Sequence, residues 1–200
     1  MKLDHETCYR ALQARDRRFD GRFFTAVLTT KIYCRPICPA PTPKRENCIF
    51  LPCAAAAHEK GFRPCLRCRP EISPGLFAQV EGAVVSRALN LIAEGALDDG
   101  KVADLAKQVG VGDRHLRRLF TEHLGASPLA VAQTRRILFA KQLIDETSLS
   151  MTDVAMAAGF MSIRRFNEVM QKLTSDRPAN CDEFMLQKIQ KTHLHPPKLR

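Results

Sequence analysis

The sequence predicts an α+β protein in which a small zinc-bound α/β module at the N-terminus is followed by an all-α double helix-turn-helix domain. Three observations support this fold class. Four of the eight cysteines form two close pairs near the N-terminus, and short runs of aromatic and β-branched residues lie around them. From residue 76 onward, apolar residues recur at helical steps of three and four. We therefore expect the zinc module at residues 1–75, the helical domain at 76–175 and a tail of uncertain structure at 176–200.

The N-terminal module is expected to contain two short strands and one short helix. Aromatic and β-branched residues dominate positions 22–30, and Cys48–Leu51 is a second strand candidate. Four prolines between these strands exclude a helix there and predict an ordered loop. Positions 54–60 predict a helix that ends at Gly61, and positions 70–75 are typical of a linker.

The helical domain is expected to begin with a supporting helix and a first helix-turn-helix unit. The supporting helix follows residue 76 and ends at the turn 98–100. Apolar positions then predict a short helix over 105–109, Gly110 breaks it, and a second helix carries an apolar stripe over 116–124. Two helices joined by a short turn that contains glycine form a helix-turn-helix unit.

The same pattern recurs after a long connecting helix. Ser127 and Pro128 form a strong helix start, and this helix is expected to reach about residue 146. Ser150 and Asp153 resemble a capping box and open another helix, which Gly159 ends. A second reader-like helix with an apolar stripe follows. The sequence thus predicts two reader helices, one in each helix-turn-helix unit.

The charge favours a polyanionic partner. The chain carries 31 Lys and Arg against 21 Asp and Glu, a formal net charge of +10, and the excess is largest near the N-terminus. Nucleic acids and membranes both attract such a charge. No apolar run approaches the roughly 20 residues of a membrane-spanning helix, and the N-terminus lacks the apolar stretch of a signal peptide. We therefore expect a cytoplasmic protein that binds nucleic acid and no membrane.

The two close cysteine pairs predict one zinc site. Three residues separate Cys34 from Cys38, and two separate Cys65 from Cys68. Such spacings bring four sulfur ligands to one tetrahedral ion. Disulfides fit poorly with a cytoplasmic chain, and an iron–sulfur cluster is the remaining alternative. The other cysteines lack a paired spacing and are expected to be ordinary small thiols. They are Cys8, Cys48, Cys53 and Cys181.

A zinc ion held by four thiolates has a net negative charge. Such a charge is unexpected inside a basic module that faces DNA if the metal only stabilises the fold. Zinc keeps sulfur deprotonated and nucleophilic at neutral pH, and neighbouring Arg and Lys side chains can bring a phosphate close to it. The charge therefore suggests a reactive thiolate.

Residues 10–72 closely resemble the N-terminal module of the Ada-type proteins. The resemblance lies in the segments FDGRF (19–23), TTKIYCRPICPA (29–40), REN (45–47) and GFRPCLRCRP (61–70). In that family a zinc-bound thiolate irreversibly accepts a methyl group from a methylphosphotriester in the DNA backbone. The resemblance assigns the acceptor to Cys34 and the other three zinc ligands to Cys38, Cys65 and Cys68. It implies a single-turnover methyltransferase, because a methylated cysteine is not regenerated.

The resemblance also implies a surface of this module that contacts DNA. It assigns Thr30, Arg45, Arg63 and Arg67 to that surface, and Arg35 beside the acceptor is expected to attract phosphate. Pro41 departs from the family pattern, because the best-known relative has a basic DNA-contacting residue there. We therefore expect the contact with the damaged strand to differ.

Residues 80–173 resemble the AraC-type double helix-turn-helix domain, with signatures over 105–120 and 154–167. This resemblance implies that polar and charged residues of the two reader helices contact DNA. These residues are Arg114, His115, Arg117 and Arg118 in the first unit and Ser162, Arg164 and Arg165 in the second. The expected partners are double-stranded DNA that carries methylphosphotriesters, promoter DNA and RNA polymerase.

The chain departs from the AraC-type pattern after Met170, where residues 173–178 replace the expected small-residue turn and proline-led closing helix. The tail that follows is polar, and its His193 and His195 are expected to be disordered rather than metal ligands.

The sequence therefore predicts a DNA-alkylation sensor that methylates its own Cys34 and then regulates transcription. Two alternatives stay open at this point. One is a zinc-stapled AraC-type transcription factor without methyl transfer, which the nucleophilicity of Cys34 would distinguish. The other is the regulatory front half of a repair fusion that lacks its glycosylase domain, for which binding of a defined duplex is the distinguishing observation.

Overall fold

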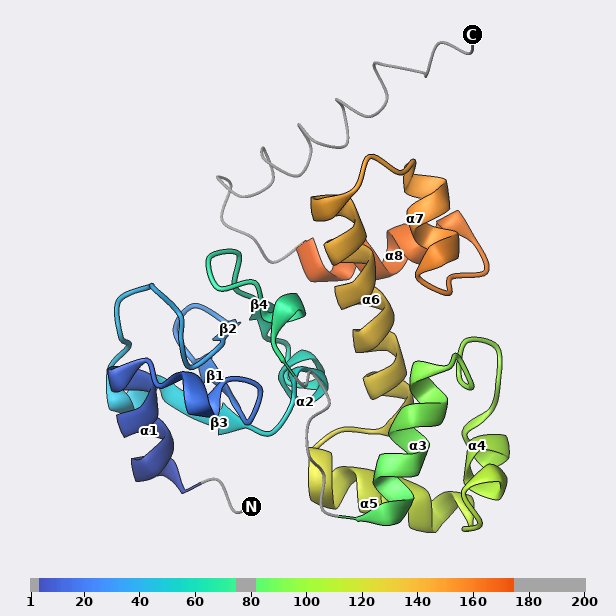
Figure 1. The fold of residues 1–200 in the computed structure, drawn as a ribbon, viewed down its shortest axis with the longest axis horizontal. Coiled ribbons are helices and arrows are strands. Elements are labelled where there is room, and N and C mark those ends of the chain that lie inside the picture. Colours follow the sequence, from blue (N-terminus) through green and yellow to red (C-terminus); the bar gives the residue numbers. More distant parts are fainter. Residues whose placement is uncertain (1–3, 75–81, 175–200) are drawn as a thin grey trace, which may run out of the picture. The chain divides into compact units, whose positions relative to one another are not determined.

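The computed structural model describes residues 4–74 and 82–174, apart from the side chains of residues 172–174 (Figure 1). The chain divides into two compact units, Met1–Leu138 and Phe139–Arg200. A small sheet with helices comes first along the chain, and helices are the elements that follow it within residues 82–174, so the α+β fold class is confirmed. The predicted module limits at residues 75 and 175 stay a prediction.

A helix that the sequence analysis does not predict, α1 (His5–Ala14), precedes the sheet. It begins after Asp4, whose carboxylate accepts a hydrogen bond from the Thr7 backbone N–H at 2.9 Å. It ends at Arg15, which adopts a left-handed conformation with φ of 49°. Its buried residues are Cys8, Ala11 and Leu12. This apolar face is small, so the helical period in the sequence is weak.

Four strands form one sheet in the order β3-β1-β2-β4. The strands are β1 (Phe24–Val27), β2 (Ile32–Cys34), β3 (Cys48–Leu51) and β4 (Arg63–Pro64). β1 pairs antiparallel with both β2 and β3, whereas β2 pairs in parallel with β4. Within residues 4–74, three short 3-10 helices lie before, between and after the strands, namely η1 (Arg17–Phe19), η2 (Arg45–Asn47) and η3 (Pro70–Ile72). The last of these replaces part of the linker predicted at 70–75.

The first strand is shorter than predicted. The sequence predicts a strand over 22–30, whereas β1 ends at Val27 and the chain turns at 28–31. Lys31 has φ of 54°, and its N–H donates to the carbonyl of Val27 at 2.9 Å, which closes the turn. β-Propensity alone does not reveal such a turn, because the threonines in it also favour strands. The second predicted strand, Cys48–Leu51, is confirmed.

The pleat of the sheet sends neighbouring side chains to opposite faces. Phe24, Ala26 and Tyr33 belong to the large core that also contains the alanines of α2 (Ala54–Glu59). Cys34, the residue after Tyr33, belongs instead to the cluster of cysteines. Adjacent residues of β2 therefore serve two different environments.

Helix α2 packs through four alanines, residues 54–57, which are all fully buried. Because each side chain is a single methyl group, the helix backbone lies close to its neighbours. A Cβ built at Gly125 would lie 3.5 Å from the Cβ of Ala56. The predicted helix over 54–60 is confirmed, and Gly61 follows it with φ of +75°.

The first unit also contains the first predicted helix-turn-helix and its supporting helix. The helices are α3 (Ala83–Ala93), α4 (Val102–Gln108) and α5 (Asp113–Leu124). Gly110, with φ of 80°, lies in the turn between α4 and α5, and Leu116 and Phe120 are fully buried. The helix-turn-helix prediction is confirmed here. Residues 75–81, where the sequence predicts the start of the supporting helix, lie outside the described residues.

The long connecting helix is α6 (Pro128–Glu146), with the bounds that the sequence predicts. Ser127 Oγ accepts a hydrogen bond from the Ala130 N–H at 3.2 Å, as expected for a helix start.

The second unit contains the second helix-turn-helix, α7 (Met151–Ala157) and α8 (Ile163–Thr174). Ser150 Oγ accepts from the Asp153 N–H at 3.1 Å and donates to its carboxylate at 2.6 Å, so the predicted capping pair is confirmed. Phe160 and Phe166 pack edge to face with ring centroids 5.2 Å apart. This unit therefore has an apolar contact that fixes α8 against the turn before it.

Cys8, Cys48 and Cys53 are buried free thiols, as predicted. Cys181, His193 and His195 lie in the tail at 176–200, outside the described residues. Within residues 4–74 and 82–174, no helix combines the length and the apolar character needed to cross a bilayer.

Gly21 is expected to tolerate no side chain. It has φ of +79°, and a Cβ there would lie 1.6 Å from the backbone oxygen of Pro74. We expect Gly21→Ala to lower the free energy of unfolding by more than about 3 kcal/mol, because left-handed strain adds to a clash with backbone that cannot move aside cheaply. Denaturant unfolding followed by circular dichroism measures the loss.

Gly61→Ala is the matched control. Gly61 also has a left-handed φ of +75°, but nothing lies within 4 Å of the added Cβ. Its cost should be limited to the conformational strain of about 1–2 kcal/mol. Equal losses for the two variants would contradict the close approach at Gly21.

Candidate functional site

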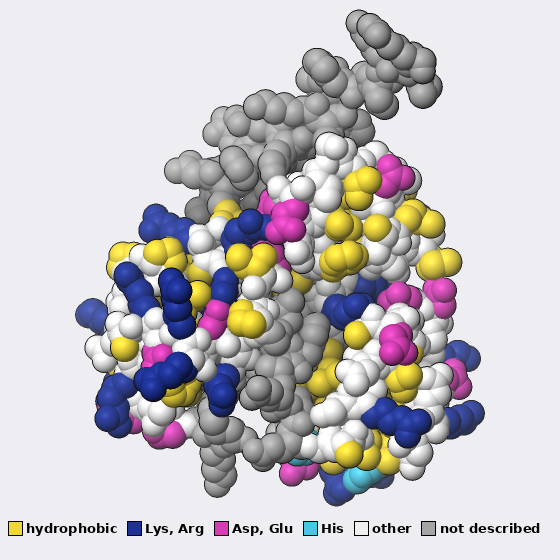
Figure 2. Space-filling model, in the orientation of Figure 1, with side chains coloured by type: hydrophobic (Ala, Val, Ile, Leu, Met, Phe, Trp, Pro, Cys, Tyr) yellow, Lys and Arg dark blue, Asp and Glu magenta, His cyan; other side chains and the backbone are white. Residues whose placement is uncertain are grey.

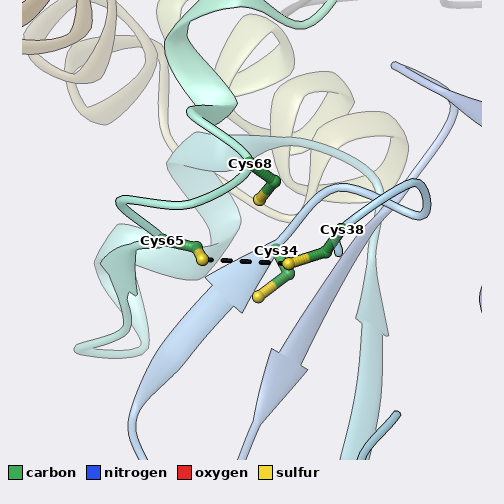
Figure 3. A group of neighbouring side chains, drawn as sticks. All are labelled: Cys34, Cys38, Cys65 and Cys68. Carbon is green, nitrogen blue, oxygen red and sulfur yellow. Dashed lines mark hydrogen bonds between the residues drawn. The ribbon is translucent and has the colours of Figure 1, made fainter. Parts of the chain in front are cut away.

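Four cysteine side chains from two distant segments meet beside the sheet (Figure 3). Cys34 ends β2 and Cys38 lies in the loop after it, while Cys65 and Cys68 follow β4. All four sulfur atoms lie within 4.8 Å of one another, and Sγ of Cys38 is 3.9 Å from Sγ of Cys65. The two predicted pairs therefore form one cluster.

The parallel pairing of β2 with β4 brings the two pairs together. The N–H of Cys65 donates to the carbonyl of Tyr33 at 3.0 Å, which aligns the second pair with the end of β2. The N–H of Arg69 donates to the carbonyl of Cys65 at 3.1 Å, and the N–H of Cys38 donates to that of Arg35 at the same distance. Each pair thus lies in a tight turn that points its sulfurs to one place.

The chemistry of the cluster fits one zinc ion. Without a cation, hydrogen bonding with Cys38 and the other sulfurs raises the pKa of Cys34 well above its ordinary value, and burial raises it further. Four thiolates at these distances repel one another, so they can all be ionised only around a cation. Four sulfur donors without a disulfide are the ligand set of a structural zinc site. The residues that would hold the zinc are Cys34, Cys38, Cys65 and Cys68.

Cys34 differs from the other three cysteines in its exposure. Cys38, Cys65 and Cys68 are buried, with exposed fractions of 5%, 7% and 7%. Cys34 is only partly buried. In addition, the backbone N–H of Arg35 donates to Sγ of Cys68 at 3.3 Å, which stabilises negative charge on that sulfur. Cys34 is therefore the most solvent-exposed residue of the cluster.

Arg35 lies inside the module rather than on its surface. It is 8% exposed, and its Nε donates to Oδ1 of Asp20 at 2.9 Å while its Nη2 pairs with the second carboxylate oxygen. Its Nη1 donates to the carbonyl of Cys68 at 3.1 Å, and Asp20 holds the pKa of the guanidinium above its usual value. The predicted phosphate contact by Arg35 would require this pair to open. We propose instead that Arg35 positions Cys68 and the loop around it.

Sequence reasoning did not identify Asp20 as the partner of Arg35. The FDG segment that contains Asp20 stands out in the sequence, but nothing in a sequence of 200 residues names the partner of a buried carboxylate. The only signal was the segment's likeness to the Ada-type pattern. Ser73 also donates to Asp20, at 3.3 Å, so this carboxylate ties together three separate segments.

The other predicted DNA contacts of the module lie at or near its surface. Thr30, Arg45 and Arg67 are exposed, whereas Arg63 is partly buried. Nε of Arg63 is buried without a hydrogen-bond partner among the described residues. Nη2 of Arg45 forms an ion pair with Glu6 at 2.6 Å. Their contacts with DNA stay a prediction.

The polar residues of the predicted reader helices are exposed in their respective units. In the first, Arg117 pairs with Asp113 at 2.9 Å and Nη2 of Arg118 lies 3.2 Å from Nδ1 of His115. In the second, Glu168 pairs with Arg164 at 3.2 Å and with Arg165 at 3.3 Å. The exposed candidates are Arg114, His115, Arg117, Arg118, Ser162, Arg164 and Arg165. Which of them contact DNA stays a prediction.

The basic excess of the sequence is visible on the surface of the N-terminal module. Figure 2 shows Lys and Arg side chains gathered over this part of the molecule, with few acidic side chains among them. A surface of this kind attracts a phosphate backbone without selecting its sequence.

Elemental analysis should find one zinc per chain. Cys65→Ser is expected to lose the metal and to unfold the module over residues 10–72, because a metal site this compact contributes folding free energy directly. A chelator should have the same effect on the unchanged protein. Cys48→Ser is the control, since Cys48 is a buried thiol outside the cluster. Less than about half a zinc per chain, or folding that is indifferent to chelator, would contradict the site.

Comparison with known proteins gives two family matches and several relatives. Residues 7–71 match the family described as the metal binding domain of Ada, and residues 105–183 match a helix-turn-helix domain family. A Mycobacterium tuberculosis protein named "Probable bifunctional transcriptional activator/DNA repair enzyme AlkA" is 50% identical over 89% of this chain. The chain spans 36% of the length of that relative.

Two further matches, one relative and one solved structure, extend over most of this chain and most of their own length. The Bacillus subtilis "Bifunctional transcriptional activator/DNA repair enzyme AdaA" is 26% identical over 92% of this chain and 85% of its own length. A solved structure described as "Crystal structure of the methylated N-ADA/DNA complex" is 34% identical, covering 66% of this chain and 96% of its own, with a TM-score of 0.34. Both family matches fall on the parts in which the structure places the cysteine cluster and the helix-turn-helix units. The chain therefore belongs to the Ada-type proteins, with the metal binding domain of Ada preceding a helix-turn-helix domain.

Proposed function

We propose that this chain is a DNA-alkylation sensor, which transfers a methyl group from a backbone methylphosphotriester to its own Cys34 and then regulates transcription. The observation that carries this proposal is a cluster of four cysteines in which one residue, Cys34, is only partly buried and the other three are buried. Methyl transfer requires direct approach of sulfur to carbon, which favours Cys34 because it is the one residue of the cluster that is not buried.

The transfer is a displacement at the methyl carbon. The sulfur of Cys34 donates an electron pair to that carbon, the S–C bond forms, and the bond between carbon and the phosphate oxygen breaks. The electron pair of the broken bond remains on the phosphate, which becomes an ordinary charged diester, so no proton has to move. Zinc, when bound, keeps the sulfurs deprotonated and nucleophilic at neutral pH. The remaining three cysteines and the buried Arg35 hold the reacting sulfur in place.

Each chain should act once. Removing the methyl group from a neutral thioether would require the cysteine sulfur to leave as a thiolate, which is slow without a strong nucleophile or an added catalyst. The protein is therefore a single-turnover methyltransferase, and its methylated form is the signalling state. The exposed Thr30, Arg45 and Arg67, with Arg63, are proposed to contact the phosphates of the damaged strand.

The helix-turn-helix units would convert methylation into regulation. Their exposed polar residues fit base and phosphate contacts in promoter DNA, and activation would require contact with RNA polymerase. Relatives named as bifunctional activators and repair enzymes support both halves of this proposal. A cytoplasmic location fits both the DNA partner and the reduced state of the cysteines.

Cys34 should be the single methylated residue. The zinc-loaded protein is incubated with duplex that contains methylphosphotriesters, and peptide mapping by mass spectrometry locates the added methyl groups. We expect one methyl on Cys34 and none on Cys38, Cys65 or Cys68, because those three are buried. Clean zinc-loaded protein that stays unmodified would rule out the repair part of the proposal and favour a purely structural zinc.

Methylation of Cys34 should tighten DNA binding. A neutral thioether replaces a thiolate, so a phosphate that approaches the site meets one negative charge less. At an effective dielectric of about 20 and a distance of about 6 Å, this charge is worth about 3 kcal/mol before screening by salt. After screening, about 1 kcal/mol remains, which corresponds to a roughly five-fold change in affinity.

The measurement is the dissociation constant of methylated and unmethylated protein on one duplex across a salt series. The difference should be largest at low salt, where screening is weakest. Equal affinities at low salt would leave Cys34 as a repair acceptor alone and would require another signal for the helix-turn-helix units.

A further inference from the structure

The residue before the methyl acceptor begins a line of hydrogen bonds that leaves the zinc module. Tyr33 and Cys34 are neighbours in β2 and face opposite sides of the sheet. The hydroxyl of Tyr33 lies 3.1 Å from Nε2 of His58, which is in α2. Nδ1 of His58 lies 3.0 Å from Oγ1 of Thr134, which is in α6. We call these three residues the hydroxyl–histidine chain.

The hydroxyl–histidine chain lies in the core. Tyr33 is fully buried and Thr134 is 2% exposed, so neither hydroxyl can exchange its partner for bulk water. Burial lowers the pKa of His58 to about 4, so the imidazole is neutral at physiological pH. A neutral imidazole has one donor and one acceptor nitrogen, so one hydroxyl donates to His58, the other accepts from it, and the two bonds are oriented in one direction. A buried polar network of this kind specifies one arrangement of its elements, because breaking any bond leaves a buried polar group unpaired.

Two further contacts tie α2 to the first helix-turn-helix unit and to the start of α6. The carboxylate of Glu59, at the end of α2, accepts hydrogen bonds from Oγ and the backbone N–H of Ser127, at 2.8 and 3.2 Å. Sγ of Cys53 donates to the carbonyl of Leu124 at 3.3 Å. Leu124 ends the first reader helix α5, and Ser127 precedes α6. Helix α2 therefore contacts the end of the reader helix and the start of the helix after it.

We propose that the hydroxyl–histidine chain carries the state of Cys34 to the first helix-turn-helix unit, with His58 and Thr134 as positioning residues for the methylation response. This inference rests on the proposed function. One peptide bond joins Cys34 to Tyr33, the residue whose hydroxyl begins the hydroxyl–histidine chain. A methyl group on Cys34 adds volume and removes charge at the end of β2, and any adjustment of that backbone moves Tyr33. Because the core is close-packed, the displacement passes through His58 to α6 rather than dissipating.

The hydroxyl–histidine chain gives the methylation of Cys34 a second way to affect DNA binding, in addition to the change in charge. The charge effect of methylation acts on any phosphate near the zinc site and weakens with salt. A packing effect through α2 acts on the first reader helix and is insensitive to salt. The two routes can therefore be separated by measuring the methylation response at high salt.

The test uses a substitution that removes a hydroxyl without changing shape. Thr134→Val deletes one end of the chain, and Tyr33→Phe deletes the other. Thr134→Ser keeps a hydroxyl group at this position and is therefore the conservative control for Thr134→Val. Thr147→Val is the matched control, because Thr147 follows the same helix and its hydroxyl contacts only near neighbours along the chain, donating to the Leu143 carbonyl at 2.6 Å and accepting from the Leu149 N–H at 3.4 Å. Thermal unfolding confirms that each variant is folded before it is compared.

Methylation is introduced by methyl iodide, and peptide mapping selects preparations modified at Cys34 alone. The readout is the ratio of dissociation constants of unmethylated to methylated protein on one duplex, at low and at high salt. We expect the wild type to keep a ratio above one at high salt. Thr134→Val and Tyr33→Phe should bring that ratio at least about three-fold closer to one, while Thr134→Ser and Thr147→Val should preserve it.

A Thr134→Val variant that is folded, methylated and keeps the wild-type ratio at high salt would overturn the inference, and so would a wild-type ratio of one at high salt. Uptake of methyl from methylphosphotriester duplex is measured on the same proteins as a separate arm. Loss of uptake in the wild type would contradict the proposed function alone, because methyl iodide sets the state of Cys34 independently of DNA.

Discussion

Mutual repulsion among four sulfur atoms within 4.8 Å of one another is the constraint on which the N-terminal part of the protein depends. Thiolates this close are stable only around a cation, so the fold must both assemble the ligands and shield them. The parallel pairing of β2 with β4 does the first, because it aligns one cysteine pair with the other. The buried ion pair of Arg35 and Asp20 shields the ligands, because Arg35 donates hydrogen bonds to Cys68 and Asp20 ties a distant segment to the cluster.

The parts of this fold that the sequence predicts are those set by neighbours along the chain. The cysteine spacings predict the cluster, and Ser127, Ser150 and the turn glycines predict helix boundaries, because a cap or a left-handed turn involves residues three or four apart. β2 and β4 escape prediction because strands of three and two residues have no readable period. α1 escapes it for a related reason, since its apolar face is small even though Asp4 caps it well.

Long-range partners are the other part that the sequence does not reveal. Arg35 looks like a phosphate ligand when it is considered beside Cys34, and only its burial against Asp20 shows a different environment. His58 and Thr134 are 76 residues apart and have no motif in common. Their meeting depends on how α2 packs against α6, which is decided by shape over the whole first unit.

The four buried alanines of α2 have a consequence for how such a protein can be rearranged. Four successive residues point to all sides of a helix, so every segment packed around this turn has to come close to the α2 backbone, as the segment around Gly125 does. Exchanging the front of this chain with that of a relative would set two surfaces together that were never fitted to each other. Chimaeras of Ada-type proteins should therefore fold best when the junction falls after Thr134, so that α2 and the segment it touches are inherited as one piece.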